Sequence, residues 1–194
     1  MGLDIGAAQV ALWAACAFFF VMGGFVKGTM GVGLPLVVVP TLSLLIPAPQ
    51  AMGLLVMPVL ISNLWQAMEG GNIRYSLKRF GSLAGVQLVV TLLTVKYSSG
   101  LSVASLNLLI AFSLLVAVLW MGFKPNLRVP PQYELAACIL VGALAGFMGG
   151  VSSLTGPFII TLLMALKLTR EQFIGSISII YLAGSLPMYG AMLW

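Results

Sequence analysis

Two short motifs in this chain combine glycines, hydroxyl-bearing residues and a proline in an order that favours anion binding. The first runs from Lys27 to Pro35 and the second from Gly149 to Pro157. Glycine lets the backbone turn sharply and approach a ligand, and proline is well tolerated at the start of a helix. Each motif therefore predicts a loop leading into a helix N-terminus, where free N–H groups and the helix dipole attract negative charge.

These motifs, together with two amide side chains of a later apolar segment, give the predicted binding site. The amides either line a pathway or form hydrogen bonds across helices. The predicted substrate-binding residues are Lys27, Gly28, Thr29, Gly31, Gly33, Pro35, Asn63, Gln66, Gly150, Ser152, Ser153, Thr155, Gly156 and Pro157. Lys27 has two interpretations: it attracts an anion from the cytoplasmic side, or its ammonium group snorkels to the membrane interface.

Glycines also have a simpler role, because small residues let membrane helices pack closely. We assign only this packing role to Gly142, Gly146, Gly81 and Gly85. The hydroxyl groups and following prolines favour a binding site for the two longer motifs.

Several kinds of chemistry have no residues to support them. The chain has no histidine, and no metal, nucleotide or catalytic-triad signature is recognisable. We therefore expect no enzymatic activity, metal or cofactor. The four acidic residues lie at the ends of apolar segments, whereas proton relays usually use carboxylates or histidines inside the membrane. These acidic residues are Asp4, Glu69, Glu134 and Glu171. We therefore expect transport that is not tightly coupled to protons.

The composition places the motifs in a membrane protein. Hydrophobic residues make up 61% of the chain and charged residues 7%, against roughly 25% charged residues in soluble domains. We predict an all-α polytopic membrane protein with about eight apolar segments, in which the second and seventh are much shorter than the ~20 residues of a full span. The segments are Ala8–Val26, Leu34–Ile46, Ala51–Met68, Phe80–Val95, Leu101–Phe123, Leu135–Met148, Pro157–Leu166 and Gln172–Trp194.

The sequence also repeats itself at an offset of 122 residues. Matching pairs include Cys16 and Cys138, Gly24 and Gly146, Pro35 and Pro157, Gln50 and Gln172, and Gly53 and Gly175. Within one transmembrane domain (1–194), we place the first repeat at 8–123 and a shortened second repeat at 130–194. Gly/Pro-interrupted repeats are typical of transporters with a site at the repeat interface. A partner protomer can supply the packing surface that the shorter repeat lacks, so a homo-oligomer is one expectation.

The basic residues predict an orientation. If all eight segments cross, only Lys96 falls on one side, and all other basic residues fall on the opposite side. These residues are Lys27, Arg74, Lys78, Arg79, Lys124, Arg128, Lys167 and Arg170. The positive-inside rule places the larger group in the cytoplasm and both termini outside. The second repeat starts five segments after the first. Because five is an odd number of membrane crossings, the second repeat has the opposite orientation and is inverted. The net charge of +5 then reflects cytoplasmic loops, and we expect no nucleic-acid partner.

The chain resembles the sulfite exporter TauE/SafE family of bacterial membrane permeases. The resemblance rests on both glycine motifs, on the stretches that follow them and on a Gly-Asn-Ile-Arg sequence at 71–74. It implies a multi-pass protein of the inner membrane that exports small anions such as sulfite, organosulfonates or related sulfur compounds. Ser152, Ser153 and Thr155 stand where the family typically has glycines.

Two other functions remain open from the sequence. Cys16 and Cys138 occupy equivalent repeat positions, as the cysteines of a membrane thiol-redox carrier do, although neither belongs to a Cys-x-x-Cys motif. A low thiol pKa needs such a partner or a nearby cation. The second alternative is a scaffold or assembly subunit that does not transport.

Overall fold

The apolar segments form helices, because a chain in a bilayer must satisfy its backbone N–H and C=O groups internally. The computed structural model describes residues 4–69, 73–98, 100–122, 128–152 and 154–192. Every regular element within these residues is helical. The elements are α1 (Asp4–Met30), α2 (Leu34–Leu42), α3 (Ala48–Leu54), α4 (Val56–Glu69), α5 (Ile73–Ser98), α6 (Val103–Gly122), a 3-10 turn (Pro131–Tyr133), α7 (Glu134–Ser152), α8 (Gly156–Ala165) and α9 (Arg170–Met192).

The lengths of the helices confirm an all-α polytopic membrane protein. Five stretches within the described residues are long and apolar enough to cross a bilayer: α1, α3 with α4, α5, α6 and α7. By contrast, α2 and α8 have 9 and 10 residues. At about 1.5 Å per residue they cover roughly half of a ~30 Å apolar layer. The two segments predicted to be short are therefore short helices.

Some helices extend beyond the predicted apolar segments. α5 begins at Ile73 rather than at Phe80, because Lys and Arg end an apolar run without ending a helix. α1 likewise continues past Val26 to Met30. The first glycine motif therefore begins inside a helix, and only its second half forms a break.

The third predicted segment is divided into α3 and α4 at Leu55. Pro58 lies in the first turn of α4 and has no N–H to donate to the carbonyl of Leu54, four residues earlier. The missing hydrogen bond accounts for the interruption.

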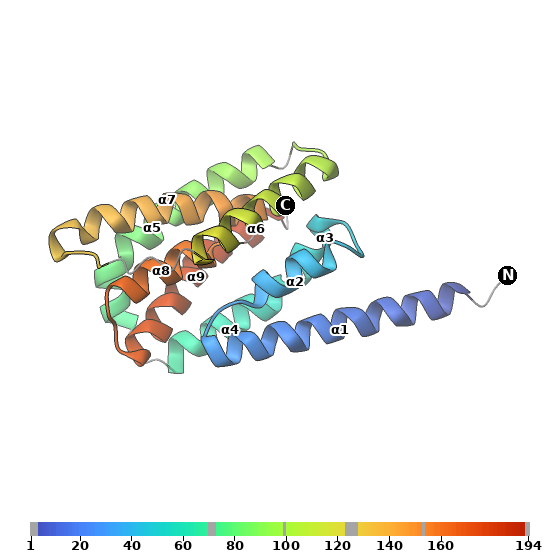
Figure 1. Cartoon of the computed structure of the whole chain (residues 1–194), viewed down its shortest axis with the longest axis horizontal. Helices are drawn as coiled ribbons and strands as arrows, with labels where there is room; N and C mark the ends of the chain where they lie inside the picture. The colour runs from blue at the N-terminus through green and yellow to red at the C-terminus, as the bar shows by residue number, and fades with distance from the viewer. Residues whose placement is uncertain (1–3, 70–72, 99, 123–127, 153, 193–194) are drawn as a thin grey trace.

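Successive helices cross the bundle in alternating directions (Figure 1). α1 runs toward the end of the bundle where α7 begins, α2 runs back, and α3 with α4 runs forward again. Their counterparts in the predicted repeat, α7, α8 and α9, each run the opposite way. This is the arrangement that an inverted repeat requires. The boundaries of the two repeats remain predictions.

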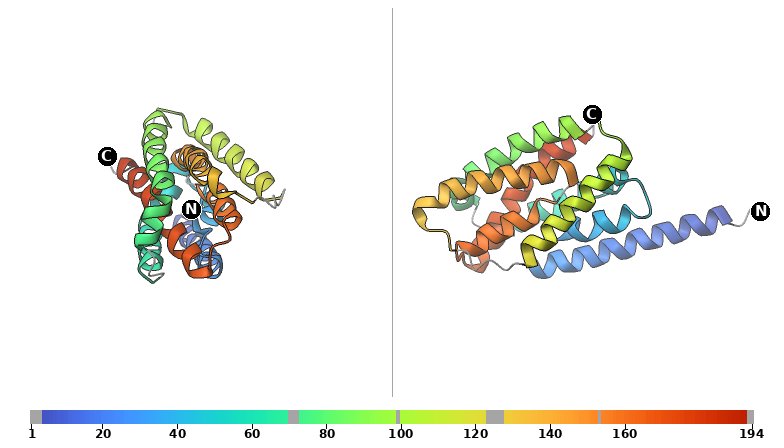
Figure 2. Two further views of the ribbon diagram at one scale, coloured as in Figure 1. Left: turned by 90° about the vertical axis from the view of Figure 1, so that its left-hand side faces the viewer. Right: turned by 45° about the horizontal axis from the view of Figure 1, so that its top comes forward.

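α1 lies along the outside of the bundle, and its N-terminal part extends beyond the other helices (Figure 2). Only 11% of the α1 span is buried within the chain, against 44% of the α7 span. Most of α1 therefore faces lipid or another protein in the membrane. The expected homo-oligomer remains a prediction.

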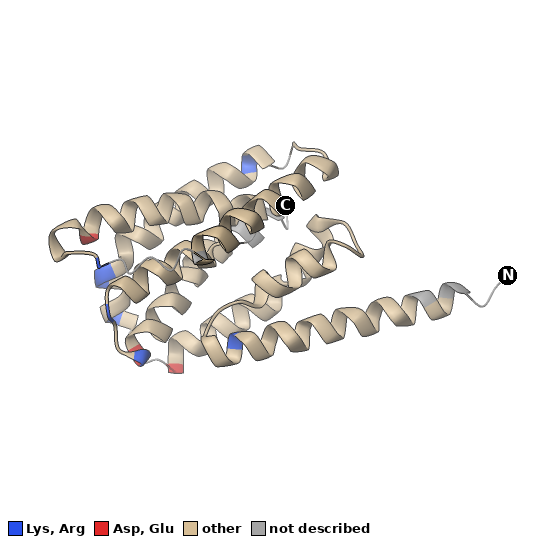
Figure 3. Ribbon diagram, viewed as in Figure 1, with Lys and Arg blue, Asp and Glu red and all other residues tan. Residues whose placement is uncertain are grey.

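Most of the described Lys and Arg residues gather at one end of the bundle (Figure 3). Lys96 lies instead in the last turn of α5, which ends at the opposite side. Among the acidic residues, Glu69 ends α4, and Glu134 and Glu171 lie in the first turns of their helices. Lys124 lies outside the described residues. The cytoplasmic location of the charged end, with both termini outside, remains a prediction.

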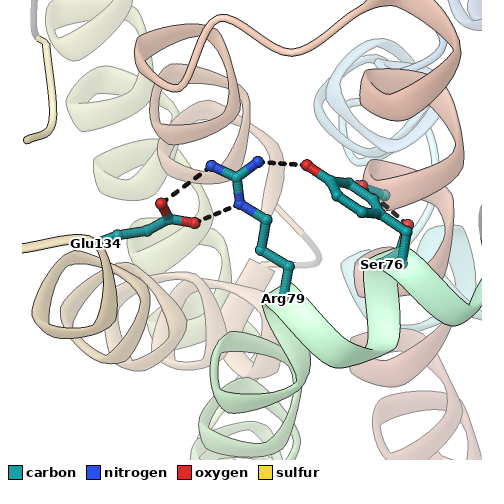
Figure 4. A network of polar contacts seen from close by, with 5 residues as sticks. Ser76, Arg79 and Glu134 are labelled. Atoms are coloured by element: carbon teal, nitrogen blue, oxygen red, sulfur yellow. Dashed lines mark hydrogen bonds and ion pairs between the residues drawn. The ribbon is translucent and has the colours of Figure 1, made fainter. Parts of the chain in front are cut away.

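A polar network joins three helices at this charged end. Nε and Nη2 of Arg79 contact the two carboxylate oxygens of Glu134 at 2.6 and 3.0 Å, and Nη1 donates to the Tyr75 hydroxyl (Figure 4). Ser76, on the same helix, shares a hydrogen bond of 2.9 Å with Ser176. Because a bidentate Arg–carboxylate pair has a fixed geometry, the network aligns α5 with both α7 and α9.

Glycines allow the close contact between α5 and α7. A Cβ atom added at Gly142 or Gly146 would lie 2.7 Å from a backbone carbonyl oxygen of α5. The predicted packing role is therefore confirmed for this pair. It is wrong for Gly81 and Gly85, where an added Cβ would meet no atom within 4 Å.

The replacement Gly146→Ala should destabilise the protein, because α7 would have to move away from α5. Overpacking of this kind costs about 1–3 kcal/mol. We expect a lower melting temperature for the purified protein in detergent, followed by tryptophan fluorescence. The control Gly85→Ala, which points into open space, should melt at the wild-type temperature or slightly above it. Equal melting temperatures for both variants would contradict this close packing.

Candidate functional site

The first glycine motif forms a break between α1 and α2. Gly31 and Gly33 adopt φ angles of 77° and 115°, a left-handed region that glycine enters without the steric cost of a Cβ atom. Gly33 is the N-cap of α2, and no side chain caps the helix there. Pro35 follows in the first turn. The free N–H groups of this turn therefore remain available to a ligand.

The second motif forms a matching break between α7 and α8. Thr155 is the N-cap of α8 and makes no side-chain capping hydrogen bond, and Pro157 lies in the first turn. A Cβ at Gly156 would lie 2.8 Å from the Tyr181 hydroxyl oxygen, so a larger residue here would displace the Tyr181 side chain. Ser153 lies outside the described residues.

Both breaks line one cavity of about 400 Å³. We call it the Lys27 cavity, after the one charged residue in its described lining. α4 and α9 supply further parts of the wall. The lining residues used below are Lys27, Gly33, Pro35, Val59, Asn63, Thr155, Gly156, Pro157, Tyr181, Gly184 and Ser185. A mostly apolar cavity of this size with a few polar groups is typical of a small-molecule site.

The lining follows the sequence repeat. Ten of the cavity residues form pairs separated by 122 positions. These pairs are Val32 and Leu154, Gly33 and Thr155, Pro35 and Pro157, Val59 and Tyr181, and Asn63 and Ser185. Positions that correspond at this offset therefore line one cavity, an arrangement typical of transporters built from repeats.

Lys27 is buried in the cavity wall. Its side chain is only 4% exposed, and its Nζ atom donates a hydrogen bond of 2.5 Å to Oδ1 of Asn63. The alternative that Lys27 snorkels to the interface is therefore wrong for this structure. No acidic residue lines the described cavity, so the ammonium charge has a neutral partner only. A buried charge without a counter-ion is costly, and an anion in the cavity would neutralise it.

The Lys27 contact also orients the Asn63 amide. An ammonium group can only donate hydrogen bonds, so the amide oxygen must face it and the NH₂ group must point elsewhere. Asn63 is fully buried, and its Nδ2 atom has no hydrogen-bond partner. The site thus holds a buried cation and an unused amide donor on adjacent side chains.

Other predicted residues lie away from the cavity lining. Thr29 Oγ1 lies 3.0 Å from carbonyl oxygens of its own helix, and Ser152 Oγ donates to the Met148 carbonyl at 2.8 Å. Gln66 accepts a hydrogen bond of 3.3 Å from Ser178 on α9.

The remaining predicted glycines also lie outside the lining. An added Cβ at Gly28 would meet nothing within 4 Å, one at Gly31 would contact Ile174, and one at Gly150 would press against Thr94. The helices continue to Met30 and Ser152. The phase of each helix, rather than the motif alone, therefore decides which residues face the cavity.

The two cysteines lie in different hydrophobic clusters. Cys16 belongs to a cluster with residues of α1 to α6, and Cys138 belongs to a second cluster with Val32 and residues of α5 and α7 to α9. Both thiols are free and buried, and neither lines the Lys27 cavity. Thiol exchange needs an accessible thiolate, so the structure does not favour the redox alternative.

The predicted binding residues omit the part of the cavity wall on α9. Tyr181, Gly184 and Ser185 line the cavity but belong to neither glycine motif. The repeat carried the signal, because Ser185 is the counterpart of Asn63 at the 122-residue offset. The offset makes this pairing possible from the sequence, but the predicted binding residues do not include Ser185.

Comparison with known proteins agrees with this architecture. The family model of the sulfite exporter TauE/SafE matches residues 15–194. No curated protein and no solved structure gave a significant match. Because the family match covers nearly the whole chain, this multi-pass membrane protein belongs to the sulfite exporter TauE/SafE family.

Proposed function

We propose that this chain is an inner-membrane permease that exports a small anion, such as sulfite or an organosulfonate, through the Lys27 cavity. The family match supports a transporter of sulfur compounds. The observation that carries the proposal is the buried Lys27 ammonium group, bonded to the neutral Asn63 amide in a cavity with no described acidic residue. An anion is the ligand that this charge lacks.

The two helix breaks support the same substrate charge. α2 and α8 both begin at the cavity, and neither has a side-chain cap on its first N–H groups. The positive ends of both helix dipoles therefore meet the cavity, where they favour negative charge. We propose that Gly33, Pro35, Thr155, Gly156 and Pro157 present this backbone surface to the anion.

The symmetry of the lining supports a mechanism by alternating access. Rocking one repeat against the other around a fixed site would open the cavity to each side in turn. Lys27 and Asn63 belong to the first repeat, and Thr155 and Ser185 belong to the second. An anion held among them would thus contact both moving parts.

Replacing Lys27 by methionine should nearly abolish transport, because the variant keeps the length of the side chain but loses its charge. A hydrogen bond to a charged group contributes about 1.5–3 kcal/mol, so we expect at least a tenfold loss of initial rate. The measurement is uptake of radiolabelled sulfite or methanesulfonate into proteoliposomes.

Two variants control for other effects. Lys27→Arg keeps the charge and should retain more flux than Lys27→Met. Thr29→Ala, whose hydroxyl is exposed and bonds within its own helix, should transport like the wild type. The site assignment fails if Lys27→Met and Thr29→Ala transport equally well.

Transport should respond to membrane voltage and not require a proton gradient, because the described carboxylates lie at helix ends. An inside-negative potential provides ~2.3 kcal/mol per charge per 100 mV for anion exit. We expect a potassium diffusion potential at uniform pH to accelerate anion efflux from proteoliposomes. Efflux that depends on a pH gradient and ignores voltage would contradict this uncoupled mechanism.

A further inference from the structure

Gln87, on α5, is a buried polar residue for which the packing gives no use. Its side chain is 0% exposed, and neither Nε2 nor Oε1 has a hydrogen-bond partner. A buried amide without partners costs stability. Such groups are rare in native proteins, and each one requires an explanation.

The Gln87 amide lies directly behind the wall of the Lys27 cavity. Gly184 of α9 is part of that wall, and a Cβ added there would collide with Gln87 Nε2 and lie 2.9 Å from its Cδ. A side chain at this point would therefore force the amide to move. The residue that separates Gln87 from the cavity has no side chain.

α9 also has a weak point in this region. Pro187 lies within the helix, and it has no N–H to donate to the carbonyl of Ala183, four residues earlier. Proline and glycine are common sites of helix bending. Gly184 lies between Ala183 and Pro187, so a bend of α9 here would move the wall between Gln87 and the cavity.

We infer that Gln87 is a second anion-binding residue, which contacts the transported anion after α9 bends at Gly184–Pro187. This inference rests on the proposed transport through the Lys27 cavity. The Gln87 NH₂ group would donate to the anion as it leaves Lys27. The ligand is the same class of small oxyanion, whose oxygens accept hydrogen bonds.

The test separates this role from a structural one. Gln87→Leu removes the unpartnered amide while keeping a side chain of similar size. Because no hydrogen bond is lost, the melting temperature should stay the same or rise. The maximal rate of methanesulfonate uptake into proteoliposomes should fall at least tenfold. KM should change less than twofold, because Lys27 and Asn63 still bind the anion.

Thr91 provides the matched control, one turn along the same helix. It is also fully buried, but its hydroxyl donates a hydrogen bond of 3.2 Å to the Gly146 carbonyl. Thr91→Val should therefore lower the melting temperature and leave the uptake rate per folded protein unchanged. Gln87→Leu should thus lower the uptake rate without lowering the melting temperature, and Thr91→Val should lower the melting temperature without lowering the uptake rate.

A double variant separates the role of Gln87 in transport from an effect on stability. Gly184→Ala alone should be destabilised by its clash with Gln87, and adding Gln87→Ala should restore the melting temperature but not the uptake rate. Wild-type uptake by Gln87→Leu, or by the double variant, would overturn the role of Gln87. If these Gln87 variants kept wild-type uptake but Lys27→Met lost it, only the role of Gln87 would be overturned and the proposed transport site would stand. Wild-type uptake by Lys27→Met would instead overturn the site itself.

Discussion

The hydrogen bond between the Lys27 ammonium and the Asn63 amide is the interaction on which the site depends. Inside a membrane, a charged group without a partner is expensive, and such groups are kept where they serve a pathway or a ligand. The amide satisfies one of the three donors of the ammonium group and leaves its charge unneutralised. An anion in the cavity is the ligand that would neutralise this charge, as the proposed function requires.

The breaks before α2 and α8 place two uncapped helix N-termini at the cavity that holds the Lys27 ammonium group. A bilayer tolerates non-helical backbone only where protein or a water-filled cavity shelters it. The breaks at Val32–Gly33 and Leu154–Thr155 lie against the cavity, which α4 and α9 also line. At the charged end of the bundle, the Arg79–Glu134 pair ties α5 to α7. Ser176 also joins the first part of α9 to this layer, whereas Gly184 and Pro187 mark the place further along α9 where the helix is most easily bent.

Much of this fold could be predicted from the sequence, because hydrophobicity, glycine and proline act locally. All eight apolar segments correspond to helical stretches, and the two short ones begin at Leu34 and Gly156. The site was less predictable, since the direction of a side chain depends on helix phase and neighbours. Thr29 and Ser152 have suitable hydroxyls, but both lie in last helical turns and bond to their own backbone. For Lys27, the position at a segment end favours snorkelling from the sequence alone, and only the structure places Asn63 beside its ammonium group.

The central claim is that both repeats enclose one cavity whose charge is set by Lys27. Single cysteines at Thr155 and Ser185, in a transport-active variant without Cys16 and Cys138, would test it most directly. The measurement is the rate of thiol modification in detergent by a methanethiosulfonate bearing a sulfonate, compared with its trimethylammonium analogue. We predict that the anionic reagent reacts at least tenfold faster at both positions, that methanesulfonate protects both, and that Lys27→Met removes the preference. Equal rates for the two reagents, or a preference that survives Lys27→Met, would contradict the account.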